Sequence, residues 1–392
     1  MKSLRPLTPA DRVQGVKKTL LRVINDMADP SCLNLGLGEP AFPTPHSLRK
    51  SIKENIDTWH LGYSPNAGLP ELRELIAAGC KGSVSPDQIC ITSGSEEALF
   101  LTIASLMEQG DEVLIPDPGF PTYASITRFF KGVPVGYKLL WQEKFHLKSD
   151  RLIPLLTDRT KAVVINSPHN PTGMIAEEKE LRKLLGYLEG KGIALISDDV
   201  YEGLVFDKPA VSPSQFFQPS FTLGSLSKTF SMTGWRLGWV ICPQEWIEAM
   251  TGLHQMMVIC ASVPAQRVAI EALKGNAREE METNKTELRR RRDLALECVK
   301  KHTDLPFIKP EGTFYIMVDI RNKISDGTTT LDIALEILKK AGVVTIPGSA
   351  FGPGGEGFLR ISFAPDPEIV QEGIRRIGRF FSSQKKDKSA KL

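Results

Sequence analysis

Cysteine is scarce in this sequence, with six residues among 392 and no pair in C-x-x-C spacing. Several of the six lie in apolar runs, so we expect reduced thiols in the core, and neither a disulfide framework nor a zinc site. Apolar stretches of about 18 residues are also missing, and the first residues contain no signal-like apolar segment. The sequence therefore predicts a cytoplasmic protein without a membrane-spanning helix.

A strong excess of one charge is missing as well. Lys and Arg number 49 against 46 Asp and Glu, which gives a formal net charge of +3. This balance provides no overall field that would attract nucleic acid or an anionic membrane, and it favours small-molecule partners. The run Arg289 to Arg292 does not change this, because four consecutive side chains on a helix point in different directions. We interpret the run as a solvated or interdomain face.

From Gln88 onward, short apolar runs alternate regularly with amphipathic stretches. This order is typical of an α/β fold with a parallel sheet. After Gly312 the pattern changes to strand-like runs, a helix near 330–341 and a final helix from about Asp366, which predicts a small α+β domain. The N-terminal segment to about His46 is expected to pack with that domain.

The length of the chain exceeds that of a single compact domain, and we predict two. The large domain is expected at 47–290. The small domain is expected to combine 1–46 with 291–392.

Three glycines, Gly352, Gly354 and Gly357, match the G-x-G-x-x-G pattern of dinucleotide sites. That pattern requires a helix that opens at the third glycine, so that the helix N-terminus meets a pyrophosphate. Here the strand-like run FLRISF follows instead, and we interpret the glycines as a flexible turn. Lys228 is preceded by Ser227 and not by glycine, so it does not belong to the phosphate loop of nucleotide hydrolases.

A lysine just after a strand-like run is the first candidate for chemistry. Lys228 has Ser225 and Ser227 before it and Arg236 eight residues after it. An amine forms a Schiff base only when it is deprotonated, and a nearby cation lowers its pKa. An arginine that also holds a phosphate would serve both purposes.

Polar residues follow other strand-like runs, at the edge where open α/β sheets place ligands. Asp198 ends one run and is followed by Asp199 and Tyr201, although adjacent acids also serve as helix N-caps. Asn170 opens the turn signal Asn-Pro-Thr-Gly at the same edge. Residues 94–95 join a strand to a helix, where backbone N–H groups either hold a phosphate or simply begin a capped helix.

Together these segments resemble the fold-type I aminotransferases of class I/II, which depend on pyridoxal 5'-phosphate (PLP). The resemblance covers nearly the whole chain in the motif order of that family. The pattern S-x-S-K followed by an arginine is met by Ser225, Ser227, Lys228 and Arg236. The pattern N-P-x-N-P-T-G appears as SPHNPTG, with Ser167 in place of its first asparagine. The resemblance implies a large PLP-binding domain with a mostly parallel seven-stranded sheet flanked by helices, plus a small α+β domain.

The resemblance also assigns roles around the cofactor ring. Asp198 is expected to pair with the protonated pyridine nitrogen and to keep the ring an electron sink. Tyr201 and Asn170 are expected to hydrogen-bond the ring 3'-oxygen, while Phe120 stacks on the ring. Lys228 is expected to carry PLP as a Schiff base and later to move a proton between the substrate Cα and C4'. Lys228, Asp198 and Tyr201 are therefore the expected catalytic residues.

Phosphate and substrate contacts follow from the same resemblance. Arg360 is expected to clamp the substrate α-carboxylate as a bidentate pair, with Asn170 beside it, and the segment at Gly38 to close over it. Tyr63 matches a tyrosine that reaches the phosphate from the neighbouring subunit, which implies a homodimer. The other expected phosphate contacts are Gly94, Ser95, Glu96, Ser225, Ser227 and Arg236.

The expected reaction moves an amino group from an L-amino acid to a 2-oxo acid through pyridoxamine phosphate. In relatives that favour dicarboxylic substrates, the position of Glu96 can hold a lysine that binds the distal carboxylate. A negative residue there predicts a neutral or aromatic amino acid in preference to aspartate. The open alternatives are a C–S β-lyase or another PLP reaction on the same fold, a PLP-sensing transcription regulator and a catalytically silent homologue.

Overall fold

The computed structural model describes residues 7–14, 16–325 and 327–389. Its centre is a seven-stranded sheet in the order β2-β8-β7-β6-β5-β3-β4. β8 runs antiparallel to both of its neighbours, and every other pair in this sheet is parallel. The mostly parallel seven-stranded sheet expected from the sequence is therefore confirmed. The strands are β2 Ile89–Thr92, β3 Glu112–Asp117, β4 Val133–Lys138, β5 Thr160–Asn166, β6 Ala194–Asp198, β7 Ser220–Ser225 and β8 Gly238–Ile241.

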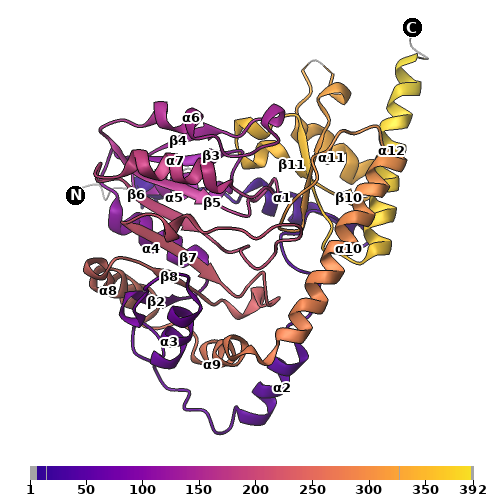
Figure 1. Cartoon of the computed structure of the whole chain (residues 1–392). Helices are drawn as coiled ribbons and strands as arrows, with labels where there is room; N and C mark the ends of the chain where they lie inside the picture. Colours follow the sequence, from indigo (N-terminus) through magenta and orange to yellow (C-terminus); the bar gives the residue numbers. More distant parts are fainter. Residues whose placement is uncertain (1–6, 15, 326, 390–392) are drawn as a thin grey trace, which may run out of the picture.

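Helices cover both faces of this sheet (Figure 1). Successive side chains of a strand point to opposite faces, so a strand that is covered on both sides is apolar throughout. In β5, Val164 packs into one core with Leu99 and Tyr123, while Val163 packs into another with Leu181. This explains the unbroken apolar runs of the sequence. The helices of this part are α2 His46–Asn55, α3 Pro70–Gly79, α4 Ser95–Leu106, α5 Pro121–Phe129, α6 Ser149–Leu152, α7 Glu178–Leu188, α8 Ile247–Val258 and α9 Val263–Glu271.

The C-terminal part forms a smaller sheet of three antiparallel strands in the order β11-β12-β9. A two-stranded parallel sheet pairs β1 with β10, so the N-terminal segment joins this part of the molecule. The strands are β1 Leu33–Asn34, β9 Tyr315–Asp319, β10 Val343–Val344, β11 Ile346–Pro347 and β12 Phe358–Ser362. The helices are α1 Leu20–Met27, α10 Arg278–His302, α11 Thr330–Ala341 and α12 Pro367–Ser389.

α11 occupies the range expected from the sequence, and its ends are explained by its caps. Thr329 accepts from the backbone N–H of Asp332, and the Asp332 carboxylate accepts from the N–H of Thr329. This is a capping box, which pairs N–H groups that a helix start leaves free. Gly342 ends the helix with φ 63°, a left-handed conformation that favours glycine.

α10 connects the two parts of the molecule as one continuous helix, drawn in orange in Figure 1, and packs along α12. Its side chains Leu288 and Leu296 join the core of the C-terminal part. The expected boundary between residues 290 and 291 lies inside this helix. The division of the chain at that boundary remains a prediction.

The arginine run lies on α10 and contacts neighbouring segments. Arg292 is 1% exposed and donates to Asp207 at 2.8 Å and to the Pro310 carbonyl at 3.2 Å. Arg291 is buried and donates to the Ala364 carbonyl at 2.5 Å. The two buried arginines join elements that are distant in the sequence, whereas Arg289 and Arg290 are exposed. The interpretation of the run as a solvated or interdomain face stays a prediction.

The glycine-rich turn does not open a helix. Residues 353–355 form one 3-10 turn, and β12 follows it. The backbone N–H of Gly354 donates to Asp117 at 2.7 Å, which docks the turn onto the end of β3. This geometry agrees with the interpretation of the glycines as a turn, because no helix opens at the third glycine.

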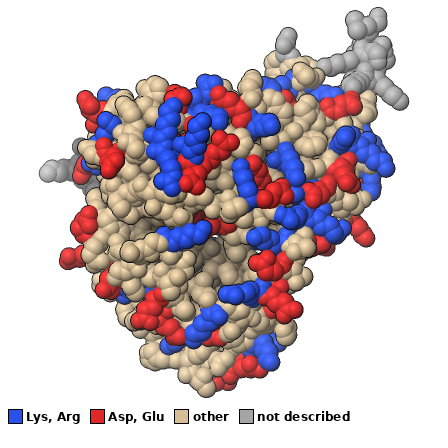
Figure 2. All heavy atoms as spheres, viewed as in Figure 1, with Lys and Arg blue, Asp and Glu red and all other residues tan. Residues whose placement is uncertain are grey.

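Acidic and basic side chains are intermixed over the described residues on the face shown in Figure 2. The same view shows a hollow near its centre, between the large sheet and α10. Within the described residues, no helix has the length and apolarity needed to cross a membrane.

Candidate active site

A cavity of about 190 Å³ lies where β5, β6 and β7 end and where α4 and α5 begin. Parallel strands bring their carboxyl ends to one edge, so residues far apart in the sequence meet there. The cavity is lined by most of the residues expected from the sequence, together with several others. The expected residues that line it are Gly38, Ser95, Glu96, Phe120, Asn170, Asp198, Tyr201, Ser227, Lys228, Arg236 and Arg360.

Asp198 is the last residue of β6, and its carboxylate lies at the wall of the cavity. Tyr123 donates to Oδ2 at 2.5 Å, and the backbone N–H of Val200 donates to Oδ1 at 3.3 Å. Burial raises the pKa of Asp198. No ion pair to this carboxylate exists among the described residues. The positive charge of Lys228 acts on the carboxylate without direct contact. A ligand with a cationic N–H would therefore find an acceptor here that has no ion pair of its own.

Lys228 reaches the cavity from the segment after β7. Its Nζ donates to the Gly38 carbonyl at 2.6 Å. Burial lowers the pKa of Lys228 to about 8; Glu39 opposes this shift, and the positive charges of Arg360 and Arg236 add to it. About a tenth of the amine is thus unprotonated at pH 7 and about half at pH 8, and an unprotonated amine is a nucleophile.

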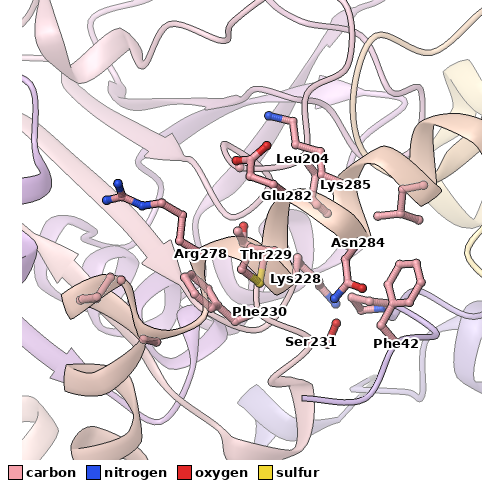
Figure 3. Close-up of a pocket in the computed structure, with 17 residues that line it drawn as sticks. Phe42, Leu204, Lys228, Thr229, Phe230, Ser231, Arg278, Glu282, Asn284 and Lys285 are labelled. Carbon is pink, nitrogen blue, oxygen red and sulfur yellow. The ribbon is translucent and has the colours of Figure 1, made fainter. Parts of the chain in front are cut away.

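Lys228 also lines a second cavity, of about 330 Å³, on the other side of its side chain. Figure 3 shows this cavity between Phe230 and Ser231 on one side and the first turns of α10 on the other. Arg278 and Lys285 extend from those turns at its border. The lysine therefore separates two hollows of the molecule.

One corner of the first cavity is suited to an anion. Gly94 precedes α4 with φ 97°, and a Cβ atom built there would lie 2.5 Å from Nη2 of Arg236. Only glycine allows this approach, because it combines the left-handed φ with the lack of a side chain. Ser225 and Ser227 lie beside the corner with their hydroxyl oxygens 2.8 Å apart. A helix N-terminus, a guanidinium and hydroxyl groups together form a typical phosphate site.

Arg360 lies on the opposite wall, on β12, and is 1% exposed. Its guanidinium donates to Asn170 Oδ1 at 3.1 Å and to the Gly36 carbonyl at 2.7 Å, and its carbon lies 4.1 Å from the centroid of the Tyr315 ring. Its Nε is buried without a hydrogen-bond partner, and the described residues provide no carboxylate to pair with it. Burial lowers the pKa of Arg360. A carboxylate of a ligand is the group that this buried cation lacks.

Three residues of the site escaped the interpretation of the sequence. Tyr123 binds Asp198, Tyr315 places its hydroxyl 3.0 Å from that of Tyr201, and Asn166 receives the backbone N–H of Asn170 at 2.8 Å. Tyr123 lies on α5, Asn166 on β5 and Tyr315 on β9, and each contacts an expected site residue. Their contacts depend on the packing of separate elements, so the local pattern gave no signal for them.

Glu96 and Phe120 lie at the rim of the cavity. Glu96 stands in the first turn of α4, is exposed, and accepts from Thr122 at 3.1 Å. Phe120 precedes α5, and its ring centroid is 5.6 Å from that of Tyr123.

Tyr63 lies outside the cavity and is 78% exposed. Its loop contacts the end of α8, since Asn66 donates to the Ile259 carbonyl at 2.8 Å. Met256, Met257 and Ile259 form an exposed apolar patch at that end. Within one chain, Tyr63 therefore makes no contribution to the cavity.

Comparison with known proteins agrees with this geometry. The family described as "Aminotransferase class I and II" matches residues 30–377. A probable aspartate/prephenate aminotransferase of Aquifex aeolicus is 39% identical over 355 residues, which cover 88% of this chain and 90% of that protein.

Solved structures agree as well. The aspartate aminotransferase of Thermus thermophilus with maleate is 31% identical with a TM-score of 0.89, over 96% of this chain and 100% of that one. The aromatic aminotransferase of Pyrococcus horikoshii is 35% identical with a TM-score of 0.87, over 93% and 99%. Lys228, Asp198 and Arg360 meet at one cavity, and the family match covers most of the chain. This chain belongs to the class I and II aminotransferases, enzymes that depend on PLP.

Proposed function

We propose that this aminotransferase takes its amino group from a neutral or aromatic L-amino acid in preference to aspartate. The observation that carries the proposal is Glu96, a carboxylate at the rim of the cavity in the first turn of α4. A second carboxylate on the substrate would meet like charge there, whereas an apolar side chain would not. The names of the relatives include aspartate, aromatic-amino-acid and alanine aminotransferases, so they leave the choice of substrate open.

The cavity residues fit PLP, and each has a proposed role toward it. When bound, PLP supplies an electron sink for the negative charge that forms at the substrate Cα. Asp198 would accept a hydrogen bond from the ring nitrogen, which gives this buried carboxylate a cationic partner in direct contact. Tyr201 and Asn170 would donate to the ring 3'-oxygen, and Phe120 would cover the ring face.

Lys228 is proposed to hold the cofactor covalently and then to act as base and acid. Its lowered pKa, about 8, leaves enough free amine at Nζ to take a proton from the substrate Cα. The same Nζ would deliver that proton to C4' of the cofactor.

The phosphate is proposed to bind at the corner described above. Its contacts would be the backbone N–H groups at the start of α4 and the guanidinium of Arg236, with two hydroxyl groups beside them. The proposed residues are Gly94, Ser95, Glu96, Ser225, Ser227 and Arg236.

Arg360 is proposed to bind the substrate α-carboxylate. Its free Nε N–H belongs to an in-plane edge of the guanidinium, and such an edge is the part that forms a bidentate pair with a carboxylate. Gly38 lies in the segment beside it, where its carbonyl already contacts Lys228. This segment is proposed to close over the carboxylate.

The proposed assembly is a homodimer in the cytoplasm. The exposed Tyr63 and the apolar patch of Met256, Met257 and Ile259 are adjacent, and covering such a patch favours association. Tyr63 would then reach the phosphate of the partner subunit. All six cysteines are free thiols, as expected in a reducing compartment.

Single-turnover experiments test the reaction and its substrate. The PLP-loaded enzyme is mixed with alanine, phenylalanine or aspartate without any 2-oxo acid, and the absorbance of the cofactor and the products are followed. We expect conversion of the cofactor to its amine form, with kcat/KM for alanine or phenylalanine above that for aspartate. A higher value for aspartate would contradict the proposal. The lyase alternative is tested with a cysteine S-conjugate, whose Cβ carries a thiol leaving group: release of that thiol with pyruvate and ammonia, in the absence of the amine form, would indicate a lyase.

The role of Glu96 is tested by two matched variants. Glu96→Gln removes the repulsion and is expected to raise kcat/KM for aspartate above that of the wild type. Glu96→Lys adds attraction and is expected to raise it by at least about tenfold over that of Glu96→Gln. Activity with alanine should change much less in both. Equal values for aspartate in the wild type and in Glu96→Gln would remove the charge of Glu96 from the explanation.

A further inference from the structure

The loop at the proposed phosphate corner is held at Ser93, the residue before Gly94. The backbone N–H of Ser93 donates to Oε2 of Glu97 at 2.5 Å. The carbonyl of the same residue accepts from Nη2 of Arg236 at 3.4 Å. Both backbone polar groups of Ser93 are thus engaged: the N–H by the Glu97 carboxylate and the carbonyl by the Arg236 guanidinium.

Glu97 provides the cap that the start of α4 otherwise lacks. Gly94 occupies the N-cap position, and no side chain caps the helix from there. Glu97 stands three residues further and reaches back past the N-cap to the N–H of Ser93, one residue before the N–H that the acid of a capping box would bind. The carboxylate therefore fixes the direction in which the chain enters α4.

Glu97 is itself fixed by a histidine from another helix. Nδ1 of His254, on α8, lies 2.8 Å from Oε1 of Glu97. His254 is 0% exposed and Glu97 is 9% exposed, so water does not compete for this contact. Nε2 of His254 is buried and has no hydrogen-bond partner, so the contact with Glu97 accounts for the polar bonding of this ring.

The Glu97 carboxylate lies close to the proposed phosphate, so its charge and its orientation have to be controlled. A carboxylate in the first turn of α4 lies at the end of the helix where the proposed site holds the phosphate, and two negative groups repel each other. A hydrogen bond from an imidazole draws charge away from one oxygen of the carboxylate and restricts its rotation. The other oxygen is then kept on the N–H of Ser93.

We propose that His254 is a positioning residue for the cofactor phosphate, which acts through Glu97 on the backbone of 93–95. This inference rests on the proposed phosphate site. It predicts that His254, which lies outside the cavity, affects the binding of the PLP phosphate and does not affect the binding of the ring.

The test compares two ligands that differ only in the phosphate. The full-length enzyme is stripped of cofactor, and Kd is measured for PLP and for pyridoxal with the wild type, His254→Leu and His254→Asn. We expect His254→Leu to weaken PLP by about tenfold or more and pyridoxal by less than about twofold. His254→Asn, which keeps an N–H donor near the position of Nδ1, should recover most of the PLP affinity.

The matched control is Met250→Leu, a substitution of a buried side chain on the same helix, whose sulfur accepts from Ser105. It should leave the ratio of the two Kd values unchanged. The ³¹P NMR shift of bound PLP should move in His254→Leu and stay in Met250→Leu. Equal weakening of PLP and pyridoxal in His254→Leu, or no weakening of either, would overturn the inference.

Two further variants keep the outcome decisive. If His254→Leu does not fold, Glu97→Met tests the same contact, because a methionine of similar length has no carboxylate oxygen to accept from Ser93 or His254. It should also weaken PLP selectively. Arg236→Gln tests the phosphate site itself. If it weakens PLP more than pyridoxal and His254→Leu does not, only the inference about His254 is rejected. If Arg236→Gln weakens both ligands equally or neither of them, the proposed phosphate site is rejected.

Discussion

Arg360 donates a 3.1 Å hydrogen bond to the side-chain oxygen of Asn170, which links β12 to the segment that follows β5. The amide holds the guanidinium in the orientation that a substrate carboxylate requires. We expect Arg360→Lys to raise KM for the amino acid about ten- to hundredfold, since a charge-assisted bond worth ~1.5–3 kcal/mol is lost. Steady-state kinetics measure this, and the Kd for PLP serves as the control that should not change.

The hydroxyl of Tyr315 supports that of Tyr201. We expect Tyr315→Phe to lower kcat/KM about fivefold, because one neutral hydrogen bond is worth about 1 kcal/mol. Tyr201→Phe should cost more, since it also removes the proposed contact to the ring oxygen. A larger loss in Tyr315→Phe than in Tyr201→Phe would contradict this order.

Asp198 and Tyr123 offer a second comparison. Asp198→Asn is expected to lower kcat about ten- to hundredfold, because the charged partner of the ring nitrogen is lost. Tyr123→Phe removes one donor to the carboxylate but keeps its charge, so kcat should fall less. Rapid-mixing kinetics of the first half-reaction provide the measurement, and equal effects of the two variants would speak against the charge of Asp198.

The pKa of Lys228 predicts a pH dependence for cofactor capture. Covalent capture requires the free amine, so in the stripped enzyme its rate should increase with pH and level off above about pH 8. A lysine with its ordinary pKa of about 10.4 would give a rate that still increases steeply between about pH 9 and 10. Stopped-flow measurement of PLP binding across this range distinguishes the two curves.

Much of the fold was predictable, because both faces of the large sheet are buried. A strand such as β5 is then apolar at every position and differs clearly from the amphipathic helices on either side of it. The change of pattern after Gly312 likewise marked the smaller sheet. The helix at α11 carried its own stop signal in Gly342.

The site residues that belong to family motifs were predictable from the sequence. The residues that reach the site through the packing of separate elements were not. Lys228, Asp198 and Arg360 stand in motifs of the family, and they meet at one cavity. Tyr123 and Tyr315 lie in sequence patterns that any helix or strand could show. Their partners are chosen by the way in which α5 and β9 meet the end of β6, and this information is not present in a local pattern.

α10 contains 25 residues, and at a rise of 1.5 Å per residue it extends about 37 Å without interruption. One end borders the cavity on the far side of Lys228, and the other lies in the core of the C-terminal part. Immediately before it, the chain leaves helical geometry at Gly275, with φ 92°. One continuous helix therefore joins the rear wall of the lysine to the core of the C-terminal part, and Gly275 interrupts the helical backbone just before the end that borders this wall.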